Sequence, residues 1–416
     1  MKHPLLFCFA LLSSLVFCAC GQSPSQPAVP ADRPGVGTGS RLFITSDVHY
    51  QQTPSGAQSL VIPQTEYIGE ITDALLWQVV ESKPDAFVLC GDLTNNGSRA
   101  EHEALAGKLQ AVANAGIAVY VLPGNHDMMG VDAEEFAQLY GSLGYGGALS
   151  RDPSSLSYTA LLPGGELLVL LDTNVYGTRE SSAEGMVSGE TLAWLRACLE
   201  QAASEGRVIL SASHHNLLHH ASERYRDSFR LDCPESLPAL LSSYGARLHL
   251  SGHRHRQHIA RQEEDGGTFC EIVSGMPIAY PNHIGELSLS AGGAGYQTLA
   301  VDVEGWAAQA GRTEEDLLRF SQYTLACGRK QAENMACSAL SSLDLSDWER
   351  REMSNVFFQL QLASSENTLM EHQQALRRSQ GYVLWMKYAA GTPWGSWMEF
   401  LLDNPAQDNC SLSLSW

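Results

Sequence analysis

The sequence predicts an α/β fold for residues 41–304, followed by a helical region at residues 305–416. The first part contains short apolar runs of strand length, separated by segments in which apolar residues recur at helical spacing. Strands that alternate with helices of this length imply crossover connections, and therefore a parallel or mixed sheet. The hydrophobic fraction of 44% is ordinary for a folded protein, and 416 residues suffice for one large domain and a smaller one.

The first half of this α/β region has alternating strands and helices. Each strand is a short apolar run, and the first of them leads into Asp47. Ser98 and Glu101 have the spacing of a capping box, which begins a helix. The strands are predicted at residues 41–46, 86–90 and 117–122, and the helices at residues 66–82 and 98–114.

The second half is richer in strands. Two apolar runs flank Pro163-Gly164-Gly165, which is typical of a hairpin turn. The strands are predicted at residues 156–162, 167–173, 208–213, 247–251, 268–274 and 297–303, and a helix at residues 192–203.

Residues 305–416 carry helical patterns with little alternation, at residues 313–327, 331–343 and 346–375. The segment from Gly381 onward is rich in Trp, Tyr and Phe. Such side chains either form an ordinary hydrophobic core or cap an active site, and the ordinary core is the more frequent role.

Residues 1–20 have the pattern of an export signal. A short basic start precedes an apolar run to Phe17, which is too short to span a bilayer. The sequence Cys18-Ala19-Cys20-Gly21 then resembles a bacterial lipoprotein signal, with Cys20 as the lipidated residue because the small Ala19 precedes it. The alternative is an ordinary secretory signal. Residues 21–40 are rich in Pro, Ser, Gly and Ala and predict a flexible tether, so we expect an exported chain, lipid-anchored to a membrane of the bacterial cell envelope.

The charge and the cysteines restrict the possible partners. Lys and Arg total 26 against 46 Asp and Glu, so the net charge is -20, and such a surface repels polyanions. Nucleic acid is therefore not an expected partner. The cysteines after Cys20 lack the paired short spacing of a zinc site, and Cys90, at the end of an apolar run, is expected to be buried and free.

Five short motifs follow predicted strands, and their residue types are those of a metal centre. They are Asp47-Val48-His49, Gly91-Asp92, Gly124-Asn125-His126-Asp127, His214-His215 and Gly252-His253-Arg254-His255. Asp47 and His49 are two residues apart, and on an extended segment they point the same way and can bind one cation. Asp92 has two carboxylate oxygens and can bridge two cations. Each motif alone is explained equally well by a turn, a helix cap or chance.

The remaining motif residues have separate expected roles. Asn125 offers a carbonyl oxygen, and His126 is expected to face the substrate, with Asp127 holding its tautomer and favouring its charged form. Of the histidine pair, His214 is the preferred ligand because it lies at the strand end. The imidazoles of the last motif are expected to converge, while Arg254 and Arg256 point away to the surface.

The order of these motifs resembles the calcineurin-like metallophosphoesterase superfamily across residues 47–255. The run from Gly91 to Gly97, with Glu101-His102 after it, most resembles the cyclic-nucleotide phosphodiesterase-like branch, although Asn216 stands where that branch usually has Pro. The resemblance implies two packed mixed sheets flanked by helices, a four-layer αββα sandwich, to which the C-terminal helices are an appendage.

The resemblance also implies a ligand set for two metal ions, and a catalytic residue. Asp92 would be shared, and His126 would protonate the leaving oxygen or steady the phosphate. The first metal would be held by Asp47, His49, Asp92 and His255, and the second by Asp92, Asn125, His214 and His253.

Oxygen and nitrogen ligands without a thiolate suit manganese, iron or zinc. The expected function is hydrolysis of a small phosphate ester, a diester or a monoester, by a hydroxide held between the two metals. A lipid anchor would favour an alternative, a hydrolase of phospholipid head groups or envelope phosphate. A third hypothesis is a non-catalytic lipoprotein that binds phosphate compounds, but no ligand position of the motifs is missing.

Overall fold

The computed structural model describes residues 39–52, 65–176, 183–220, 230–405 and 407–416. The predicted signal segment, Cys20 and nearly all of the predicted tether lie outside these ranges. Within them, no helix combines the length and apolar character that crossing a bilayer requires. The bounds of the strands are β1 Arg41–Thr45, β2 Ala86–Cys90, β3 Ala118–Leu122, β4 Ser150–Arg151, β5 Tyr158–Leu161, β6 Leu167–Leu171, β7 Ile209–Ser213, β8 Leu248–Ser251, β9 His258–Glu264, β10 Gly267–Val273, β11 His283–Ser290, β12 Gly293–Ala300 and β13 Ser411–Ser415.

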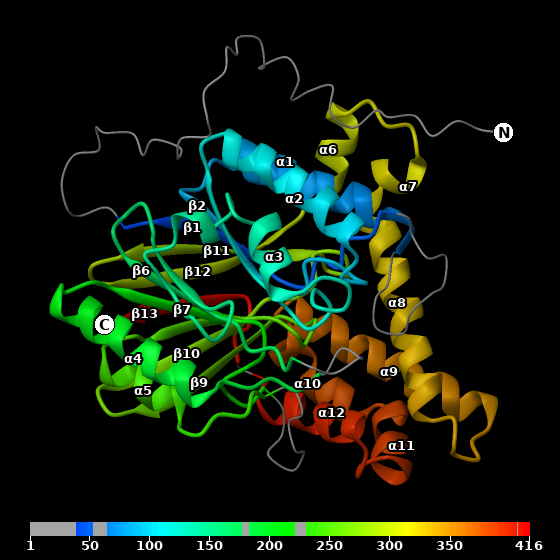
Figure 1. The fold of residues 1–416 in the computed structure, drawn as a ribbon. Helices are drawn as coiled ribbons and strands as arrows, with labels where there is room; N and C mark the ends of the chain where they lie inside the picture. Colours follow the sequence, from blue (N-terminus) through cyan, green and yellow to red (C-terminus); the bar gives the residue numbers. More distant parts are fainter. Residues whose placement is uncertain (1–38, 53–64, 177–182, 221–229, 406) are drawn as a thin grey trace.

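The helices fall into two groups, one flanking the sheets and one at the C-terminal end of the chain (Figure 1). Their bounds are α1 Ile68–Ser82, α2 Arg99–Asn114, α3 Ala133–Leu139, α4 Gly189–Ser204, α5 Leu237–Ser243, α6 Val303–Gln309, α7 Glu315–Leu318, α8 Phe320–Ala339, α9 Asp347–Ser365, α10 Leu369–Arg378, α11 Gln380–Tyr388 and α12 Pro393–Asp403.

Two mixed sheets form the centre of the fold. The six-stranded sheet has the order β13-β12-β11-β1-β2-β3, with parallel pairing from β1 to β3 and antiparallel pairing from β1 outward to β13. The seven-stranded sheet has the order β4-β5-β6-β7-β8-β10-β9, in which β6, β7, β8 and β10 are parallel neighbours. The mixed sheets predicted from the alternation and the family resemblance are confirmed.

The sheets pack face to face, and helices cover their outer faces. On β6, Leu168 and Leu170 join the core between the sheets, whereas Leu167, Val169 and Leu171 pack beneath α4 and α5. A strand buried on both faces reads as a continuous apolar run, as this one does. The opposite layer is α1 and α2, which lie over the six-stranded sheet (Figure 1). The four-layer αββα arrangement is therefore confirmed.

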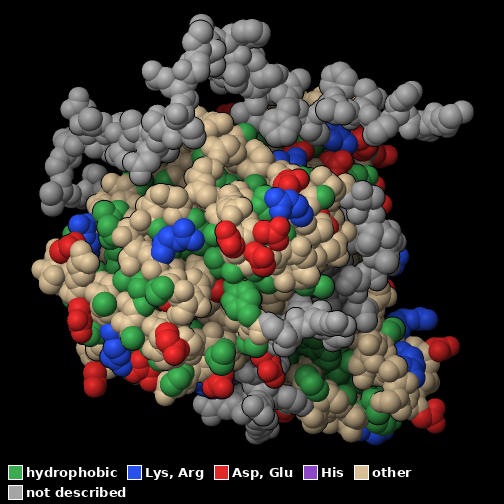
Figure 2. All heavy atoms as spheres, in the orientation of Figure 1, with side chains coloured by type: hydrophobic (Ala, Val, Ile, Leu, Met, Phe, Trp, Pro, Cys, Tyr) green, Lys and Arg blue, Asp and Glu red, His purple; other side chains and the backbone are tan. Residues whose placement is uncertain are grey.

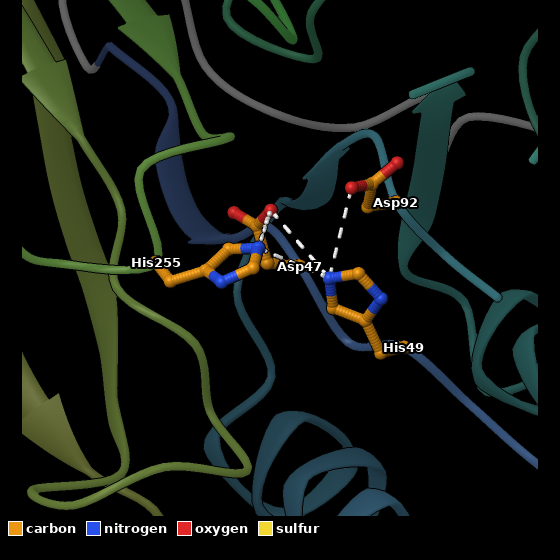
Figure 3. Close-up of side chains that lie close together, drawn as sticks. All are labelled: Asp47, His49, Asp92 and His255. Carbon is orange, nitrogen blue, oxygen red and sulfur yellow. Dashed lines mark hydrogen bonds and ion pairs between the residues drawn. The ribbon is translucent and has the colours of Figure 1, made fainter. Parts of the chain in front are cut away.

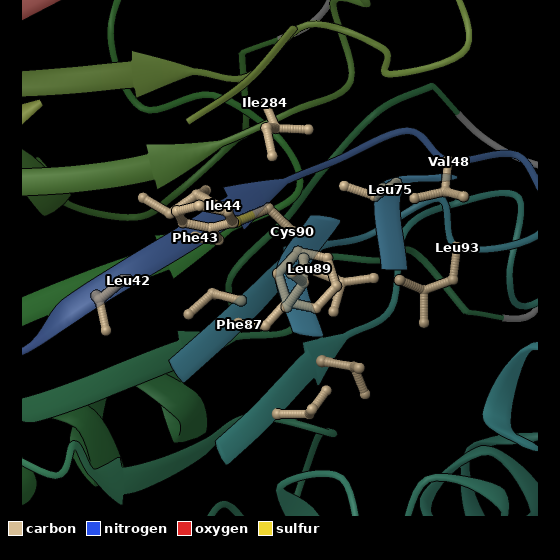
Figure 4. Packing of buried hydrophobic residues seen from close by; sticks show 14 of the residues in the cluster. Leu42, Phe43, Ile44, Val48, Leu75, Phe87, Leu89, Cys90, Leu93 and Ile284 are labelled. Atoms are coloured by element: carbon tan, nitrogen blue, oxygen red, sulfur yellow. The ribbon is translucent and has the colours of Figure 1, made fainter. Parts of the chain in front are cut away.

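The inner strands of the six-stranded sheet are almost wholly apolar. Figure 4 shows Phe43, Phe87 and Leu89 packed together in this core, with Cys90 beside them. Cys90 is buried and free, and all the cysteines in the described residues are free. The predicted capping box at the start of α2 is present, with Ser98 and Glu101 bonding each other's backbone N–H. The predicted hairpin of β5 and β6 is also present.

The C-terminal helices have a hydrophobic core of their own, centred on the buried Trp385, whose indole N–H donates to the Met353 carbonyl at 2.8 Å. Two helix boundaries differ from the prediction. Residues 313–327 and 331–343 were predicted as separate helices, but α8 runs without a break through Gly328. Residues 346–375 were predicted as one helix, but the chain turns at Asn367, where φ is 56°.

Several strands were missed by the sequence analysis. The strand β13 lies in the region predicted to be helical, yet it pairs with β12 and forms the edge of the six-stranded sheet. Its sequence, Ser-Leu-Ser-Leu-Ser, alternates with period two, and this signal could have identified it. The strands β9 and β11 were also not predicted, and the Gly-rich stretch at residues 291–295 is the turn and start of β12.

Candidate active site

The chemical motifs meet where parallel strands of both sheets end. Asp47 and His49 follow β1, Asp92 follows β2, and Asn125 follows β3. His214 follows β7, and the segment from His253 to His255 follows β8. The carboxyl ends of parallel strands share one edge of a sheet, so residues far apart in sequence become neighbours.

The first cluster contains Asp47, His49, Asp92 and His255, whose ligand atoms lie within 4.8 Å of one another (Figure 3). His255 Nε2 lies 3.3 Å from Asp47 Oδ1, and His49 Nε2 lies 3.6 Å from Asp92 Oδ2. The two Nε2 atoms of His49 and His255 are 3.2 Å apart. Four donor atoms thus surround one small volume.

The second cluster contains Asp92, His214 and His253. His214 Nε2 lies 3.3 Å from Asp92 Oδ2 and 3.1 Å from His253 Nδ1. Asn125 joins it, because its Oδ1 lies 3.2 Å from the same His214 nitrogen. His215 points elsewhere, and its Nδ1 lies 2.8 Å from Thr173 Oγ1. The structure therefore brings His214, and not His215, to the site.

Asp92 links the two clusters through one oxygen. Its Oδ1 accepts from the backbone N–H of His126 at 2.8 Å, whereas the buried Oδ2 has no hydrogen-bond partner in the described structure. Burial alone would raise the pKa of Asp92, but His214 above all, with His126 and His49, holds this pKa well below its usual range. Asp92 is therefore an ionised carboxylate with one oxygen between two groups of nitrogen donors.

Backbone carbonyls fix which histidine nitrogens face the clusters. His214 Nδ1 lies 2.9 Å from the Cys90 carbonyl oxygen, and His253 Nε2 lies 3.0 Å from that of Ala183. A carbonyl only accepts, so each of these nitrogens carries a proton and the other ring nitrogen faces the cluster. The contact with the Ala183 carbonyl could not be predicted, because every residue has a backbone acceptor and the sequence does not indicate which one a histidine contacts.

The pKa values of His49 and His253 leave these rings neutral, so that the nitrogens facing the clusters can offer lone pairs to a cation. Burial lowers the pKa of His49 to about 3 and that of His253 to about 3, so both rings are neutral at pH 7. For His214, burial is outweighed by Asp92, which raises its pKa to about 9. That proton belongs to a site without a cation and has to leave when a cation is bound.

The donor set fits a pair of cations. The His49 and His255 Nε2 atoms lie 3.2 Å apart, and the Asp92 Oδ2 near them is buried without a hydrogen-bond partner in the described structure, which is unfavourable for a carboxylate. A cation in each cluster would satisfy the nitrogens, the Asp47 carboxylate and the shared Asp92 oxygen together. Two ions are the arrangement that this geometry supports, and the oxygen and nitrogen donors do not identify the metals.

The route by which the side chains converge differs from the prediction. Asp47 and His49 were expected on an extended segment, but both have left-handed backbones, with φ of 54° and 44°. The same holds for Asp92, His253 and His255, with φ of 48°, 69° and 60°. Such conformations cost roughly 1–2 kcal/mol per non-glycine residue, and they persist where the surroundings enforce them. His253 and His255 belong to different clusters, as the family resemblance implied, although their spacing alone suggested that they converge.

Motif glycines permit the close approach of the strand ends. A Cβ on Gly91 would lie 2.6 Å from Nδ1 of His214, and one on Gly252 would lie 1.8 Å from Oγ of Ser46. Neither position has room for a side chain. The glycines are therefore part of the site because they let the two sheets bring their ends together.

Comparison with known proteins assigns a family to this arrangement. Residues 40–257, just over half of the chain, match the family model described as calcineurin-like phosphoesterase. The chain belongs to the calcineurin-like phosphoesterase family. Residues 302–408 match a second model, described as the C-terminal domain of cyclic nucleotide phosphodiesterase. Membership and the two clusters together identify a metal-dependent hydrolase of phosphate esters with a binuclear centre.

Individual relatives are distant. A protein named UDP-2,3-diacylglucosamine hydrolase from Xanthomonas axonopodis pv. citri (strain 306) is 27% identical over 199 residues, which are 46% of this chain and 77% of that protein. A protein of the same name from Xanthomonas oryzae pv. oryzae (strain PXO99A) has the same identity and coverage. Among solved structures, a dimetal phosphatase from Danio rerio has a TM-score of 0.47 at 15% identity, covering 63% of this chain and 96% of that one. Purple acid phosphatase from yellow lupin has a TM-score of 0.44 at 13% identity, covering 65% of this chain and 52% of that one.

Within this phosphoesterase site, the predicted role of Asp127 is wrong. Asp127 was expected to orient the His126 ring, but its carboxylate accepts backbone N–H groups of Leu93, Thr94 and Gly124. The His126 ring is instead oriented by the Asn95 carbonyl, 2.8 Å from Nδ1. Neighbouring side chains diverge, so Asp127 faces inward to hold two loops while His126 faces the site.

Two buried residues that tie the site loops together were missed as functional candidates. Glu271 on β10 accepts from the backbone N–H groups of Leu217 and Leu218, at 2.6–3.1 Å, and from Ser251 Oγ at 2.6 Å. Asn216 Nδ2 donates to the Gly252 carbonyl at 3.0 Å. Both residues connect the loop after His214 with the turn before His253. A buried Glu in an otherwise apolar strand was the available signal for the first of them.

Replacing Gly91 by Ala should displace His214. We expect Gly91→Ala to lower metal affinity at least about tenfold and to destabilise the protein by roughly 1–3 kcal/mol, because the new methyl overlaps the imidazole at positive φ. Gly107→Ala in α2 is the matched control, since nothing lies within 4 Å of its Cβ, and it should be neutral or slightly stabilising. Calorimetric metal titration and thermal unfolding measure both effects. Unchanged metal affinity in Gly91→Ala would contradict the packing argument.

Glu271 should make stability depend on pH. Burial opposes its ionisation, but His220, then His249 and Ser251, outweigh it and lower the pKa of Glu271 to about 2, from 4.5 in the unfolded chain. The ionised group therefore stabilises the fold above about pH 4.5, and this stabilisation is lost as the pH falls toward 2.

We expect Glu271→Gln to destabilise the protein at pH 7 by about 2–4 kcal/mol and to flatten the loss of stability over that acid range. Urea unfolding at a series of pH values measures both. The exposed Glu333→Gln on α8 is the control and should match the wild type. If the slope of stability against pH is the same in Glu271→Gln as in the wild type, Glu271 is not the group responsible.

Proposed function

We propose that the chain is a phosphodiesterase whose two metal ions share Asp92. The observation that carries this proposal is the buried Asp92 Oδ2, which lies 3.3 Å from His214 and 3.6 Å from His49, one nitrogen from each cluster. The match of residues 302–408 to the C-terminal domain of cyclic nucleotide phosphodiesterase favours a diester over a monoester.

The ligands proposed from the sequence are supported by the geometry of the site. One ion would be held by Asp47, His49, Asp92 and His255, and the other by Asp92, Asn125, His214 and His253. Manganese, iron and zinc all suit this donor set. When bound, such a pair supplies Lewis acidity that draws charge from the phosphate and makes a nucleophile of water at neutral pH.

His126 is the proposed proton donor to the leaving oxygen. Its Nδ1 donates to the Asn95 carbonyl, so Nε2 is the nitrogen that can exchange a proton with the substrate. The ring lies edge-on to that of His49, with 4.7 Å between centroids, and is partly exposed. A proton donor in this position typically contributes 10²–10⁴-fold to the rate.

A small phosphodiester fits the surface better than nucleic acid does. Lys and Arg side chains on the face shown in Figure 2 lie apart from one another and near acidic side chains, and they do not form a basic track. The net charge of -20 also disfavours binding of nucleic acid, because it repels a polyanion.

A second candidate substrate is a phosphate ester of the cell envelope. The curated relatives are named for a uridine diphosphate derivative of a diacylated sugar. The lipoprotein-type sequence at Cys20 would hold the enzyme at a membrane, close to such a substrate.

Variants of Asp92 and His126 separate metal binding from proton transfer. Asp92→Ala should lose both metals and all activity on bis(4-nitrophenyl) phosphate. His126→Ala should keep about two metals per chain, while kcat on methyl phenyl phosphate, whose leaving oxygen needs a proton, falls about 10²-fold or more. Elemental analysis and initial rates measure these effects, with a chelator control, and His372→Ala, an exposed histidine on α10, serves as the matched variant. Wild-type turnover by His126→Ala would refute the proton-donor role, and no hydrolysis by the metal-loaded wild type would refute the proposed function.

The lipid anchor is a separate prediction. Cys20→Ala should abolish incorporation of labelled fatty acid and move the protein from the membrane fraction to the soluble fraction of the expressing bacterium. Cys18→Ala is the matched control and should retain both label and location. Fatty-acid label that persists in Cys20→Ala would show that a residue other than Cys20 carries the lipid.

A further inference from the structure

A cavity of about 400 Å³ lies between the metal site and the C-terminal helices. One wall is the segment from His253 to His258, and the opposite wall comes from α8, α9 and α12. Cavities of this size hold small organic ligands. Because His253 and His255 belong to the two metal-ligand clusters and also line the cavity, the cavity adjoins the metal site.

The charge of the cavity is unlike that of the whole chain. No Asp or Glu is among the described residues that line it, although the chain has 46 of them, whereas Arg254 and Arg256 both contribute. These two arginines were expected to point away to the surface, and this prediction is wrong. The cavity is therefore suited to a ligand with negative charge or hydrogen-bond acceptors.

Arg256 is held by aromatic rings, with no carboxylate at ion-pair distance in the described part of the chain. Its guanidinium carbon lies 5.3 Å from the ring centre of Trp394 and 4.8 Å from that of Trp397. With the Gln361 amide turned so that its oxygen faces Arg256, that oxygen accepts from Nη1 at 3.1 Å. The same oxygen also accepts from Nη2, and the Met335 sulfur lies 3.9 Å from Nη2. A guanidinium has five N–H donors, more than these contacts use, so donor capacity remains for an acceptor in the cavity.

We propose that this cavity binds the organic group that the scissile phosphate carries, and that this group is a flat aromatic or heteroaromatic ring with an acceptor atom facing Arg256. The proposal rests on the proposed function and names the part of the protein that selects the substrate. Trp394, Trp397 and Tyr280 supply aromatic surface, and the arginines supply donors. An alkyl chain would cover the same apolar walls but would leave the guanidinium without its acceptor.

Three diesters with one leaving group test this assignment. Methyl 4-nitrophenyl phosphate, hexadecyl 4-nitrophenyl phosphate and thymidine 5′-(4-nitrophenyl) phosphate all release 4-nitrophenolate, so they differ only in the group assigned to the cavity. For the metal-loaded wild type we expect kcat/KM to be highest for the thymidine ester, at least about tenfold above the methyl ester. Arg256→Gln and Trp397→Ala should each bring that ratio close to one.

The controls separate substrate selection from damage to the metal site. Arg329→Gln removes an exposed guanidinium that also lies over an aromatic ring, Phe358 at 4.8 Å, but does not line the cavity, so it should keep the wild-type ratio. Metal content is measured for each variant, and if Trp397→Ala does not fold, Arg256→Gln decides. Equal kcat/KM for the thymidine and methyl esters, a preference for the hexadecyl ester, or proportional losses on all three esters would each overturn the proposal while leaving the phosphodiesterase function intact. Hydrolysis of none of the three would refute the phosphodiesterase function and this proposal with it.

Discussion

The arrangement of this protein depends on one buried carboxylate that two groups of nitrogen donors share. Asp92 Oδ2 has no hydrogen bond in the described structure and lies between His49 and His214, which come from different sheets. A buried carboxylate oxygen is unfavourable unless positive charge lies beside it, and here that charge comes from the His214 proton without a metal and from the cations when they are bound. The need for cations at this point explains why the strand ends of both sheets converge, and it ties metal binding to the stability of the fold.

That convergence places unusual demands on the backbone. The left-handed conformations of Asp47, Asp92 and His253, among others, and the absence of space at Gly91 and Gly252 are two consequences of bringing the sheet ends so close. Residues away from the clusters hold the strained loops in place. Glu271 accepts hydrogen bonds from Leu217, Leu218 and Ser251, and so links two loops. Asp127 links the loops after β2 and β3 in the same way. Rigid support of this kind keeps ligand atoms within reach of a cation before it binds.

Much of the fold and the identity of the converging residues could be predicted from sequence, because strand periodicity and motif order are local signals. The predictions that were wrong concern residues whose environment is set by tertiary contacts. Gly328 resembles a helix end, but it lies inside α8, where a Cβ would lie only 2.9 Å from Tyr280, so packing against Tyr280 accounts for the glycine. Asp127 resembled a partner for His126, yet it faces the backbone of another loop. Arg256 resembled a surface residue, yet α12, more than a hundred residues later in the chain, supplies the two tryptophans that pack against it. No local pattern carries such information.

The C-terminal helices contribute to the proposed function because they form one wall of the cavity beside the metal site. The chemistry itself depends on the Asp92 carboxylate that the two cations would share. Anomalous X-ray diffraction from crystals of the manganese- or zinc-loaded protein tests this sharing most directly. Two peaks on either side of Asp92 Oδ2, each about 2 Å from that oxygen, are the predicted result. A single peak, or a pair bound away from Asp92, would contradict it.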